Sequence, residues 1–235
     1  MACYVPFNDR NLDISLFTLR PTVVFVDELV EALKQISSYT ESLGCVHSSI
    51  FRSIHGNLII WYGAWMKRSS ENKQLLSAAL LSMLTNNHVS TMAMLVEHSF
   101  FNAYTGESRD GSPAAKFFTG DIVSLSSASS LSAGNDSSAN WASYESMAMF
   151  KELFGKKMNG ASSGVCLKSQ AHPRIVCLFV WKSLQQCYSY ILDSDYRKQL
   201  AILPNLEGFA QLDVKYDVFK VVYVSGDDVL NNIDR

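Results

Sequence analysis

The stretch Leu58 to Met66, LIIWYGAWM, limits the available folds more than any other part of the chain. On an extended strand Trp61 and Trp65 share one face, Tyr62 points to the other, and the flanking side chains make both faces apolar. This pattern is typical of a central strand that is covered on each side. The preceding Gly56 and Asn57 favour a tight turn, because both residue types tolerate positive φ. The sequence therefore predicts a hairpin inside a layered structure.

Helices are predicted on either side of this hairpin. The segment 21–43 carries an apolar stripe at helical spacing, with Gly44 placed to end the helix. After the hairpin, Ser69 or Ser70 can cap a helix whose apolar positions repeat every three to four residues as far as residue 86. Segments 90–101 and 114–125 are typical of strands, and the turn-rich segment 105–113 lies between them.

The same order of elements recurs in the second half of the chain. A helix is predicted over 141–154, a hairpin over 164–182, a helix over 184–203 and two strands over 209–226. Both halves would then run helix, hairpin, helix, hairpin. The predicted fold class is therefore α+β, an antiparallel sheet layered with helices, arranged as one domain or as two tandem modules.

A serine-rich stretch separates the two halves. Eight of the sixteen residues from Ser124 to Ala139 are Ser. Such a composition is typical of a flexible linker or a long mobile loop. We therefore expect an N-terminal module over 1–123, a linker over 124–139, and 140–235 as a second module or a continuation of the first. The candidate phosphorylation sites in this stretch are Ser126, Ser127, Ser129 and Ser130.

Charge and composition exclude several classes of protein. The formal net charge of −2 gives no long-range field that would attract nucleic acid or anionic lipid. The apolar runs are shorter than the roughly 20 residues that cross a bilayer, so no membrane contact is predicted. Five Cys without a C-x-x-C pair are typical of reduced thiols, and no export signal is visible. We expect a cytoplasmic or nuclear location, or both.

Two glycine-containing or acidic segments imitate functional motifs. Gly160–Gly164, GASSG, has the spacing of a nucleophile elbow around Ser162, but that motif needs a strand before it and a helix after it. Here the predicted order is the reverse, and no His follows the later acidic residues. The segment Asp193–Pro204 begins like a calcium loop but has Arg, Lys and Pro at positions where oxygen ligands or Gly are required.

Metal and cofactor sites are not predicted either. The five His lack the i, i+4 spacing that places two imidazoles on one helical face. His47 and His55 share one side of a predicted strand, where local hydrogen bonding is the simpler interpretation. The sequence predicts no catalytic residue, no metal and no cofactor.

The aromatic residues Trp61, Tyr62 and Trp65, with the basic pair Lys67 and Arg68 after them, could also form a platform that binds nucleic acid. Bases can stack on aromatic side chains, but a strand that is apolar on both faces favours core packing, and the chain has no basic excess. The candidates that remain for contact with a partner are Lys67 and Arg68, together with Trp65 at the end of the strand.

These observations favour a non-enzymatic intracellular module that binds another protein or a second copy of itself, with no cofactor and no nucleic acid. The alternative is a small-molecule-binding protein or an enzyme with a pocket between its layers, in which Asp227 and Asp228 are candidate polar groups. A third hypothesis is RNA binding, which would be sensitive to salt.

Two resemblances bear on this choice. The order of elements over 21–123 resembles that of roadblock, longin and profilin-like domains, which implies assembly with a partner. Segments 1–15, 55–73 and 100–112 resemble an uncharacterised land-plant family, a domain of unknown function. That resemblance implies a plant source and an intracellular protein, and it supplies no activity.

Overall fold

The computed structural model describes residues 2–7, 11–129, 150–151, 154–172, 174–193 and 215–225. The described strands are β1 (Cys3–Pro6), β2 (Leu12–Pro21), β3 (Cys45–Ser53), β4 (Ile59–Met66), β5 (Ala93–Ser108), β6 (Ala114–Phe117), β7 (Ile122–Ser129), β8 (Ala161–Ser169), β9 (Arg174–Trp181) and β10 (Lys215–Val224). The helices are α1 (Val26–Thr40), α2 (Ser70–Asn86), α3 (Val89–Met92) and α5 (Leu184–Leu192), with short 3-10 turns at Val23–Phe25 and Glu41–Leu43. Residues 150–151 and 154–156 are also helical.

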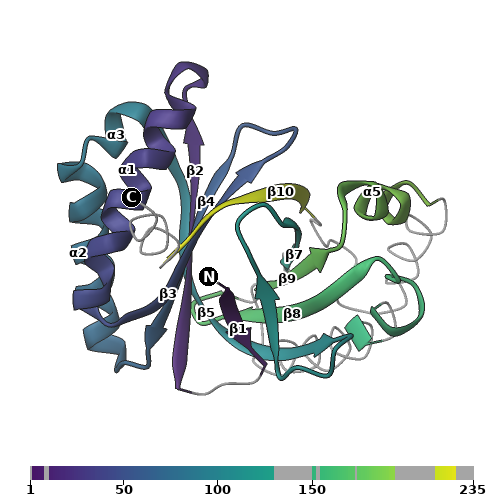
Figure 1. Cartoon of the computed structure of the whole chain (residues 1–235). Coiled ribbons are helices and arrows are strands. Elements are labelled where there is room, and N and C mark those ends of the chain that lie inside the picture. The colour runs from purple at the N-terminus through teal and green to yellow at the C-terminus, as the bar shows by residue number, and fades with distance from the viewer. Residues whose placement is uncertain are drawn as a thin grey trace, which may run out of the picture.

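Eight of the strands form a closed antiparallel barrel in the order β10-β3-β4-β2-β5-β8-β9-β7 (Figure 1). Residues 12–108, which we call the first half, contribute four neighbouring barrel strands in the order β3-β4-β2-β5. Residues 122–224, the second half, contribute the other four in the order β8-β9-β7-β10. In the first half the chain runs strand, helix, strand, strand, helix, strand, which is the order of a ferredoxin-like unit. The two halves meet at the β5–β8 and β10–β3 pairings, which close the sheet.

The predicted arrangement in layered helix-hairpin modules is therefore wrong, although the structure does combine helices with an antiparallel sheet. The closed barrel gives no support to the resemblance to roadblock, longin and profilin-like domains. The prediction omitted β2, whose Ile14 and Leu16 face the barrel interior while Phe17 faces the helices. The β5–β8 and β10–β3 pairings join segments far apart in the chain, so local sequence patterns could not predict them. One sheet closed on itself replaces two layered modules.

The barrel interior is a packed apolar core. One face of every barrel strand contributes to it, and Phe51, Tyr62 and Phe101 are among its large side chains. A two-stranded ribbon made of β1 and β6 adds further buried side chains to the same core, including Val5 and Phe117. The amino terminus and β1 accordingly lie over the centre of the barrel in Figure 1.

A second core lies outside the barrel, beneath α1 and α2. Trp61 and Trp65 point into this layer from β4, and each is 1% exposed. Leu33 of α1 and Leu80 of α2 pack against the same cluster, while Tyr62 lies on the opposite face of the strand. The predicted β3–β4 hairpin and the core role of this aromatic cluster are both confirmed.

A third core covers the outer face of the second half. It includes Phe150 and Phe154 from the helical residues, Trp181 from β9 and Cys187 from α5. Gly164 lies beneath these rings, because a Cβ there would come within 2.6 Å of the Phe179 ring. The last glycine of GASSG is therefore a packing requirement within β8 and not part of a nucleophile elbow.

Several local predictions can be compared directly with the structure. The cap of α2 is confirmed, since the Ser69 side chain accepts a hydrogen bond from the Asn72 amide. The predicted turn at 105–113 is partly wrong, because β5 continues without interruption to Ser108. The predicted linker is wrong for Ser124–Ser129, which belongs to β7, and residues 130–139 lie outside the described part of the chain.

Serine fits β7 because its side chains alternate with larger apolar ones. Val123 and Leu125 face the barrel interior, whereas Ser124 faces outward and accepts a 2.8 Å hydrogen bond from Trp181 Nε1. A strand needs only one apolar face when a hydroxyl on the other face finds a donor.

Candidate functional site

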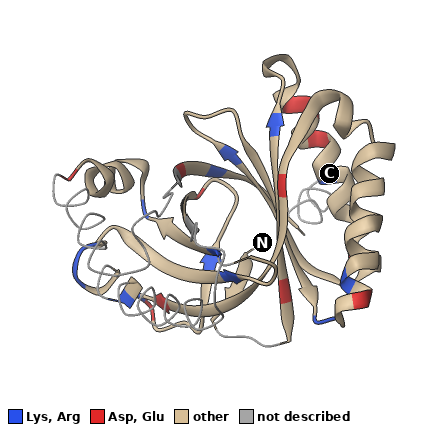
Figure 2. Cartoon of the chain, turned by 180° about the vertical axis from the view of Figure 1, so that it is seen from behind, with Lys and Arg blue, Asp and Glu red and all other residues tan. Residues whose placement is uncertain are grey.

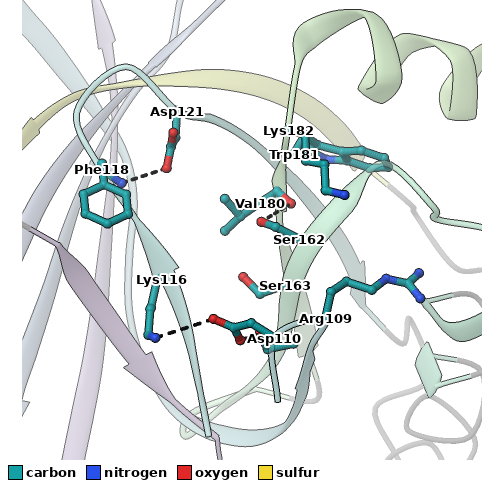
Figure 3. A pocket seen from close by; sticks show the side chains of 11 residues that line it. Arg109, Asp110, Lys116, Phe118, Asp121, Ser162, Ser163, Val180, Trp181 and Lys182 are labelled. Carbon is teal, nitrogen blue, oxygen red and sulfur yellow. Dashed lines mark hydrogen bonds and ion pairs between the residues drawn. The ribbon is translucent and has the colours of Figure 1, made fainter. Parts of the chain in front are cut away.

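A pocket of about 460 Å³ opens at one end of the barrel, where β5 and β9 end and β8 begins (Figure 3). We call it the end pocket. Its volume falls within the range of about 300–1,000 Å³ that is typical of small-molecule sites. Its lining residues are Ser108, Arg109, Asp110, Lys116, Phe118, Asp121, Ser162, Ser163, Val180, Trp181 and Lys182.

A tight turn between β6 and β7 positions Asp121 and Phe118 at this pocket. The Phe118 amide donates to Asp121 Oδ2 at 2.8 Å, and the Asp121 amide donates to the Phe118 carbonyl at 3.1 Å. Gly120 has a φ of 101°, which favours glycine at this position. Hydrogen bonds between the turn and Val221 of β10, at 2.8 and 2.9 Å, hold the turn on the barrel.

Ser163 faces the pocket from the opposite wall. It lies on the same side of β8 as Val165 and Leu167, which belong to the barrel interior, so its side chain points inward (Figure 3). Ser163 is 3% exposed, and its Oγ has no hydrogen-bond partner in the structure. By contrast, Ser162 Oγ donates to the Val180 carbonyl at 3.2 Å. Of the two adjacent serines, Ser163 is the one whose bonding capacity remains unused.

The charged groups of the end pocket are partly paired with one another. Lys116 Nζ lies 3.6 Å from Asp110 Oδ2. The Ser108 hydroxyl and the Ser112 amide also donate to Asp110, and these contacts lower the pKa of that carboxyl. The guanidinium of Arg109 turns away from the pocket, donates to the carbonyls of Phe154 and Met158, and lies 4.6 Å from the Phe154 ring.

Asp121 differs from Asp110 in having no cation beside it. Burial raises the pKa of the Asp121 carboxyl, and the hydrogen bond from the Phe118 amide offsets only part of that effect. Within the described residues, no Lys or Arg forms an ion pair with Asp121. Besides the exposed Lys182, the end pocket therefore contains two polar groups with unused capacity, the half-buried Asp121 carboxyl and the buried Ser163 hydroxyl. A titratable group perturbed by burial in a cleft is a feature of functional sites.

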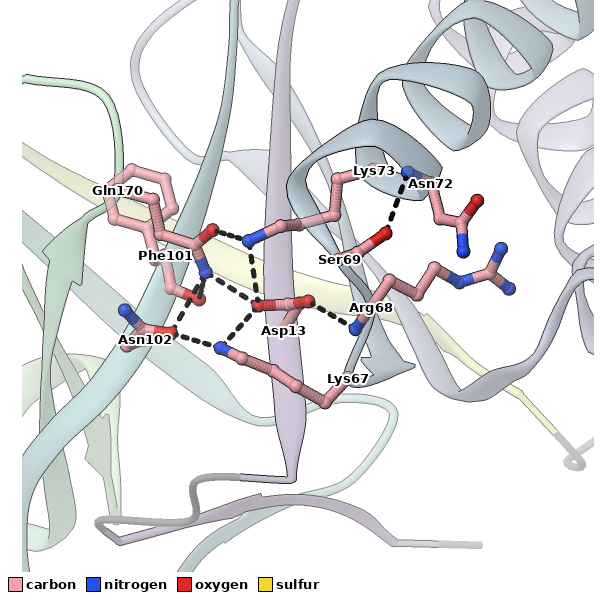
Figure 4. A network of polar contacts seen from close by, with 9 residues as sticks. All are labelled: Asp13, Lys67, Arg68, Ser69, Asn72, Lys73, Phe101, Asn102 and Gln170. Atoms are coloured by element: carbon pink, nitrogen blue, oxygen red, sulfur yellow. Dashed lines mark hydrogen bonds and ion pairs between the residues drawn. The ribbon is translucent and has the colours of Figure 1, made fainter.

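The three residues predicted for partner contact all have partners within the protein, and Lys67 is also exposed. Trp65 is buried, and its Nε1 donates to Ser15 Oγ at 2.8 Å, so it offers no surface to a partner. Lys67 Nζ lies 2.7 Å from a carboxylate oxygen of Asp13 (Figure 4). The backbone amide of Arg68 donates to the same carboxylate, and its guanidinium donates to the Leu43 carbonyl. The two basic side chains thus have structural partners.

Three of the four candidate phosphorylation sites lie in strand β7. Ser126 and Ser127 are half-buried in β7, which is paired on one side with β9 and on the other with β10. A strand paired on both sides leaves little backbone for a modifying enzyme to bind, and phosphorylation at these two positions stays a prediction. Ser129 ends the same strand, paired with Arg174. Ser130 lies outside the described residues, as do Asp227 and Asp228.

His98 is a second perturbed group, although no described pocket reaches it. Its ring stacks on Phe17 with 3.8 Å between centroids, its Nδ1 lies 3.3 Å from Ser77 Oγ, and its Nε2 is buried without a partner. Burial lowers the pKa of His98 from 6.5 to about 4. Neither its position nor its environment could be predicted from the isolated His in the sequence.

The shifted pKa of His98 predicts acid sensitivity. The unfolded chain binds a proton on this ring near pH 6.5, but the folded chain does so only near pH 4. The contribution to stability is therefore complete above pH 6.5 and is lost as the pH falls toward 4. Allowing for partial exposure, we expect a loss of about 2 kcal/mol that His98→Phe abolishes. Urea unfolding between pH 7.5 and 4 measures this difference.

The matched control for this prediction is His172→Gln, because His172 is exposed. It should keep the pH dependence of the unmodified protein. An identical pH profile for His98→Phe and the unmodified protein would show that His98 titrates normally.

The described residues give no sign of a metal-holding group, since none of their His, Cys, Asp and Glu side chains gather in threes or more. Nor does any helix in the described ranges have the length and apolar character needed to cross a membrane. The five Cys are all free thiols.

Comparison with protein families gives a match over the part of the chain that holds the end pocket. A model described as a domain of unknown function, DUF7392, matches residues 99–219. The chain belongs to the DUF7392 family. The matched DUF7392 residues run from β5 to β10 and include every residue that lines the end pocket. Among curated proteins, none matches this DUF7392 chain.

Solved structures share the fold of this DUF7392 protein at low sequence identity. An anthrone oxidase-like protein matches with a TM-score of 0.68 and 13% identity, covering 94% of this chain and 95% of that one. A Fusobacterium nucleatum protein provisionally named a monooxygenase gives 0.60 and 5%, covering 91% and 94%. A Lactobacillus acidophilus protein with the same provisional name gives 0.53 and 9%, covering 92% and 96%.

These matches correct the preferred functional prediction. The roadblock-like order of elements, which implied assembly with a partner, finds no support in the barrel topology. The fold is instead shared with an anthrone oxidase-like protein and two proteins provisionally named monooxygenases. The prediction of a non-enzymatic interaction module is therefore wrong, and its alternative, a small-molecule-binding protein or an enzyme, agrees better with the comparisons. The described end pocket lies at the end of the barrel, whereas that alternative placed its pocket between layers.

Proposed function

We propose that this protein binds a small organic molecule in the end pocket. The observation that carries the proposal is the buried, unpartnered hydroxyl of Ser163, which faces the same pocket as the unpaired carboxyl of Asp121. An unsatisfied buried polar group costs roughly 1–3 kcal/mol, so its retention inside a pocket calls for an explanation. A ligand that hydrogen-bonds to it supplies one.

The stability of the protein without ligand tests the first half of this argument. Ser163→Ala removes a hydroxyl that has no partner, so the free energy of unfolding should stay the same or rise by up to about 1 kcal/mol. Ser124→Ala is the matched control, because the Ser124 hydroxyl is buried and accepts from Trp181 Nε1 at 2.8 Å. It should lower the free energy of unfolding by about 1–2 kcal/mol. Urea unfolding of both variants measures the contrast, and a larger loss for Ser163→Ala would contradict it.

The location of binding is tested by nuclear magnetic resonance. A library of small polar and aromatic compounds is added to the ¹⁵N-labelled full chain, and amide shifts are followed. Compounds that bind should perturb amides of the lining residues, at 108–110, 116, 118, 121, 162–163 and 180–182. If no compound perturbs these amides, or if binders perturb only the helical layers, the proposed site is wrong.

The predicted plant source, the cytoplasmic or nuclear location and the protein partner or homodimer stay predictions. The proposal concerns binding, for which the pocket volume and the two unused polar groups are the supporting facts.

A further inference from the structure

The groups that lack a partner in the end pocket indicate the class of ligand. Lys116 forms an ion pair with Asp110, and the Arg109 guanidinium donates to backbone carbonyls outside the pocket. Besides Lys182, which is exposed, Asp121 and Ser163 are the lining polar groups that remain. Both can accept a hydrogen bond, and a carboxylate can do nothing else.

The Asp121 carboxylate is the stronger of these two acceptors. It receives one N–H, from Phe118 at 2.8 Å, and a carboxylate has room for several donors. Burial raises the pKa of this carboxyl, and the hydrogen bond from the Phe118 amide lowers it by less. A half-buried negative charge without a counter-ion is costly, and a bound cation would remove that cost.

Apolar surface lies next to this charge. Val180 projects into the pocket from β9, and the Phe118 ring stands beside Asp121 (Figure 3). Phe118 is 50% exposed, which is high for a residue of its size held in a tight turn. An aromatic face near a carboxylate favours a cation with a carbon body, because the ring attracts the charge and covers the carbon atoms.

Resting on the proposed function, we propose that the ligand is a small organic amine bound as its ammonium ion. The ammonium donates to the Asp121 carboxylate, and the carbon body lies between Val180 and the Phe118 ring. Ser163 Oγ, on the opposite wall, remains for a second donor group of the ligand. No bond is made or broken in this step.

Three probes of the same shape separate this class from its alternatives. Benzylamine, benzyl alcohol and benzoate carry the same ring and differ in the charge and donor capacity of the head group. Each is titrated into the ¹⁵N-labelled full chain at pH 7.5, and the dissociation constant is taken from the lining amides. We expect benzylamine to bind about tenfold more tightly than benzyl alcohol, as a charge-assisted bond should, and benzoate to bind least.

A pair of isosteric variants tests the role of Asp121. Asp121→Asn keeps an oxygen that can accept from the Phe118 amide, so the turn should survive, and the amide spectrum checks this. The variant should weaken benzylamine about tenfold and leave benzyl alcohol within about twofold. Asp27→Asn removes the same charge from an exposed site paired with Arg52 and should leave both affinities unchanged.

The outcomes distinguish the two proposals. If the shifts of the lining amides give a lower dissociation constant for benzyl alcohol or benzoate than for benzylamine, the amine class is wrong and the proposed site stands. The same conclusion follows if Asp121→Asn leaves the dissociation constant of benzylamine unchanged. If none of the three probes moves the lining amides, both the amine class and the proposed function are contradicted.

Discussion

Asp13→Asn is expected to lower the free energy of unfolding by about 3 kcal/mol, because it neutralises a buried charge on which several donors converge. Asp13 is 1% exposed on β2. Its carboxylate receives Lys67 Nζ and Gln170 Nε2, each at 2.7 Å, and Lys73 Nζ lies 3.7 Å away (Figure 4). Asparagine fills the same volume, so the loss should come from the charge and not from a cavity.

This network joins the two halves of the chain. Lys73 belongs to α2 in the first half, and its Nζ donates to Gln170 Oε1 at 2.5 Å, beyond the end of β8 in the second half. Gln170 Nε2 also donates to Asn102 Oδ1 at 2.9 Å, and Lys67 donates to the same oxygen at 2.8 Å. Once Asp13 is neutral, two ammonium groups remain side by side without an anion, which is why the predicted loss is large.

Hydrogen bonds lower the pKa of Asp13, whereas burial lowers the pKa of His98. Burial acts to raise the pKa of Asp13, but the hydrogen bonds from Lys67, Gln170 and the Arg68 amide outweigh burial and lower it. A carboxyl with a lowered pKa stabilises the fold above its ordinary pKa and loses that effect as the pH falls through the folded-state value. Asp13→Asn should therefore remove a stability contribution that is complete at neutral pH.

The control for Asp13→Asn is Glu31→Gln. Glu31 forms a 2.6 Å ion pair with Lys34 on the exposed face of α1, and such pairs contribute less than about 1 kcal/mol. Urea unfolding with a common m-value gives both losses. Equal losses for the two variants would contradict the assignment of Asp13 as a buried network centre.

Trp65→Ala is expected to lower the free energy of unfolding by about 4 kcal/mol, the larger of these two effects. The indole is 1% exposed beneath the helices of the first half, and it loses both its packing and the 2.8 Å hydrogen bond to Ser15. The ring also covers Gly63, since a Cβ there would come within 2.7 Å of Trp65 Nε1. Chemical denaturation followed by circular dichroism provides the measurement.

The adjacent residue is the natural control for Trp65. Met66 ends the same strand, but its side chain is 56% exposed, so Met66→Ala should cost less than about 1 kcal/mol. A loss for Trp65→Ala close to that for Met66→Ala would mean that the outer core is not where the stability of β4 arises.

The sequence predicts features that depend on neighbouring residues. The cap of α2 at Ser69 and the two apolar faces of β4 are of this kind, because capping and alternation act within a few residues. Barrel closure is of another kind. The pairing of Phe101 with Ser169, or of Val221 with Phe51, joins segments whose mutual register leaves no local trace.

The end pocket was missed for a related reason. The GASSG motif indicates Ser162 as the residue of interest. The alternation of Ser163 with Val165 and Leu167 is the sequence signal that places the Ser163 hydroxyl inside the barrel. Likewise, the Gly120-Asp121 turn could be recognised in the sequence, whereas its position opposite Ser163 depends on the closed sheet.

Closure of the barrel also determines how the end pocket can respond to a ligand. In a ring of eight strands every barrel strand is hydrogen-bonded on both sides, so widening one end would break main-chain hydrogen bonds. The wall that carries Ser163 and Val180 is therefore stiff, and adaptation is left to side chains such as Phe118 and to the turn that bears it. A stiff wall loses little conformational entropy on binding, so the part of the pocket that carries Ser163 and Val180 is already arranged for its ligand.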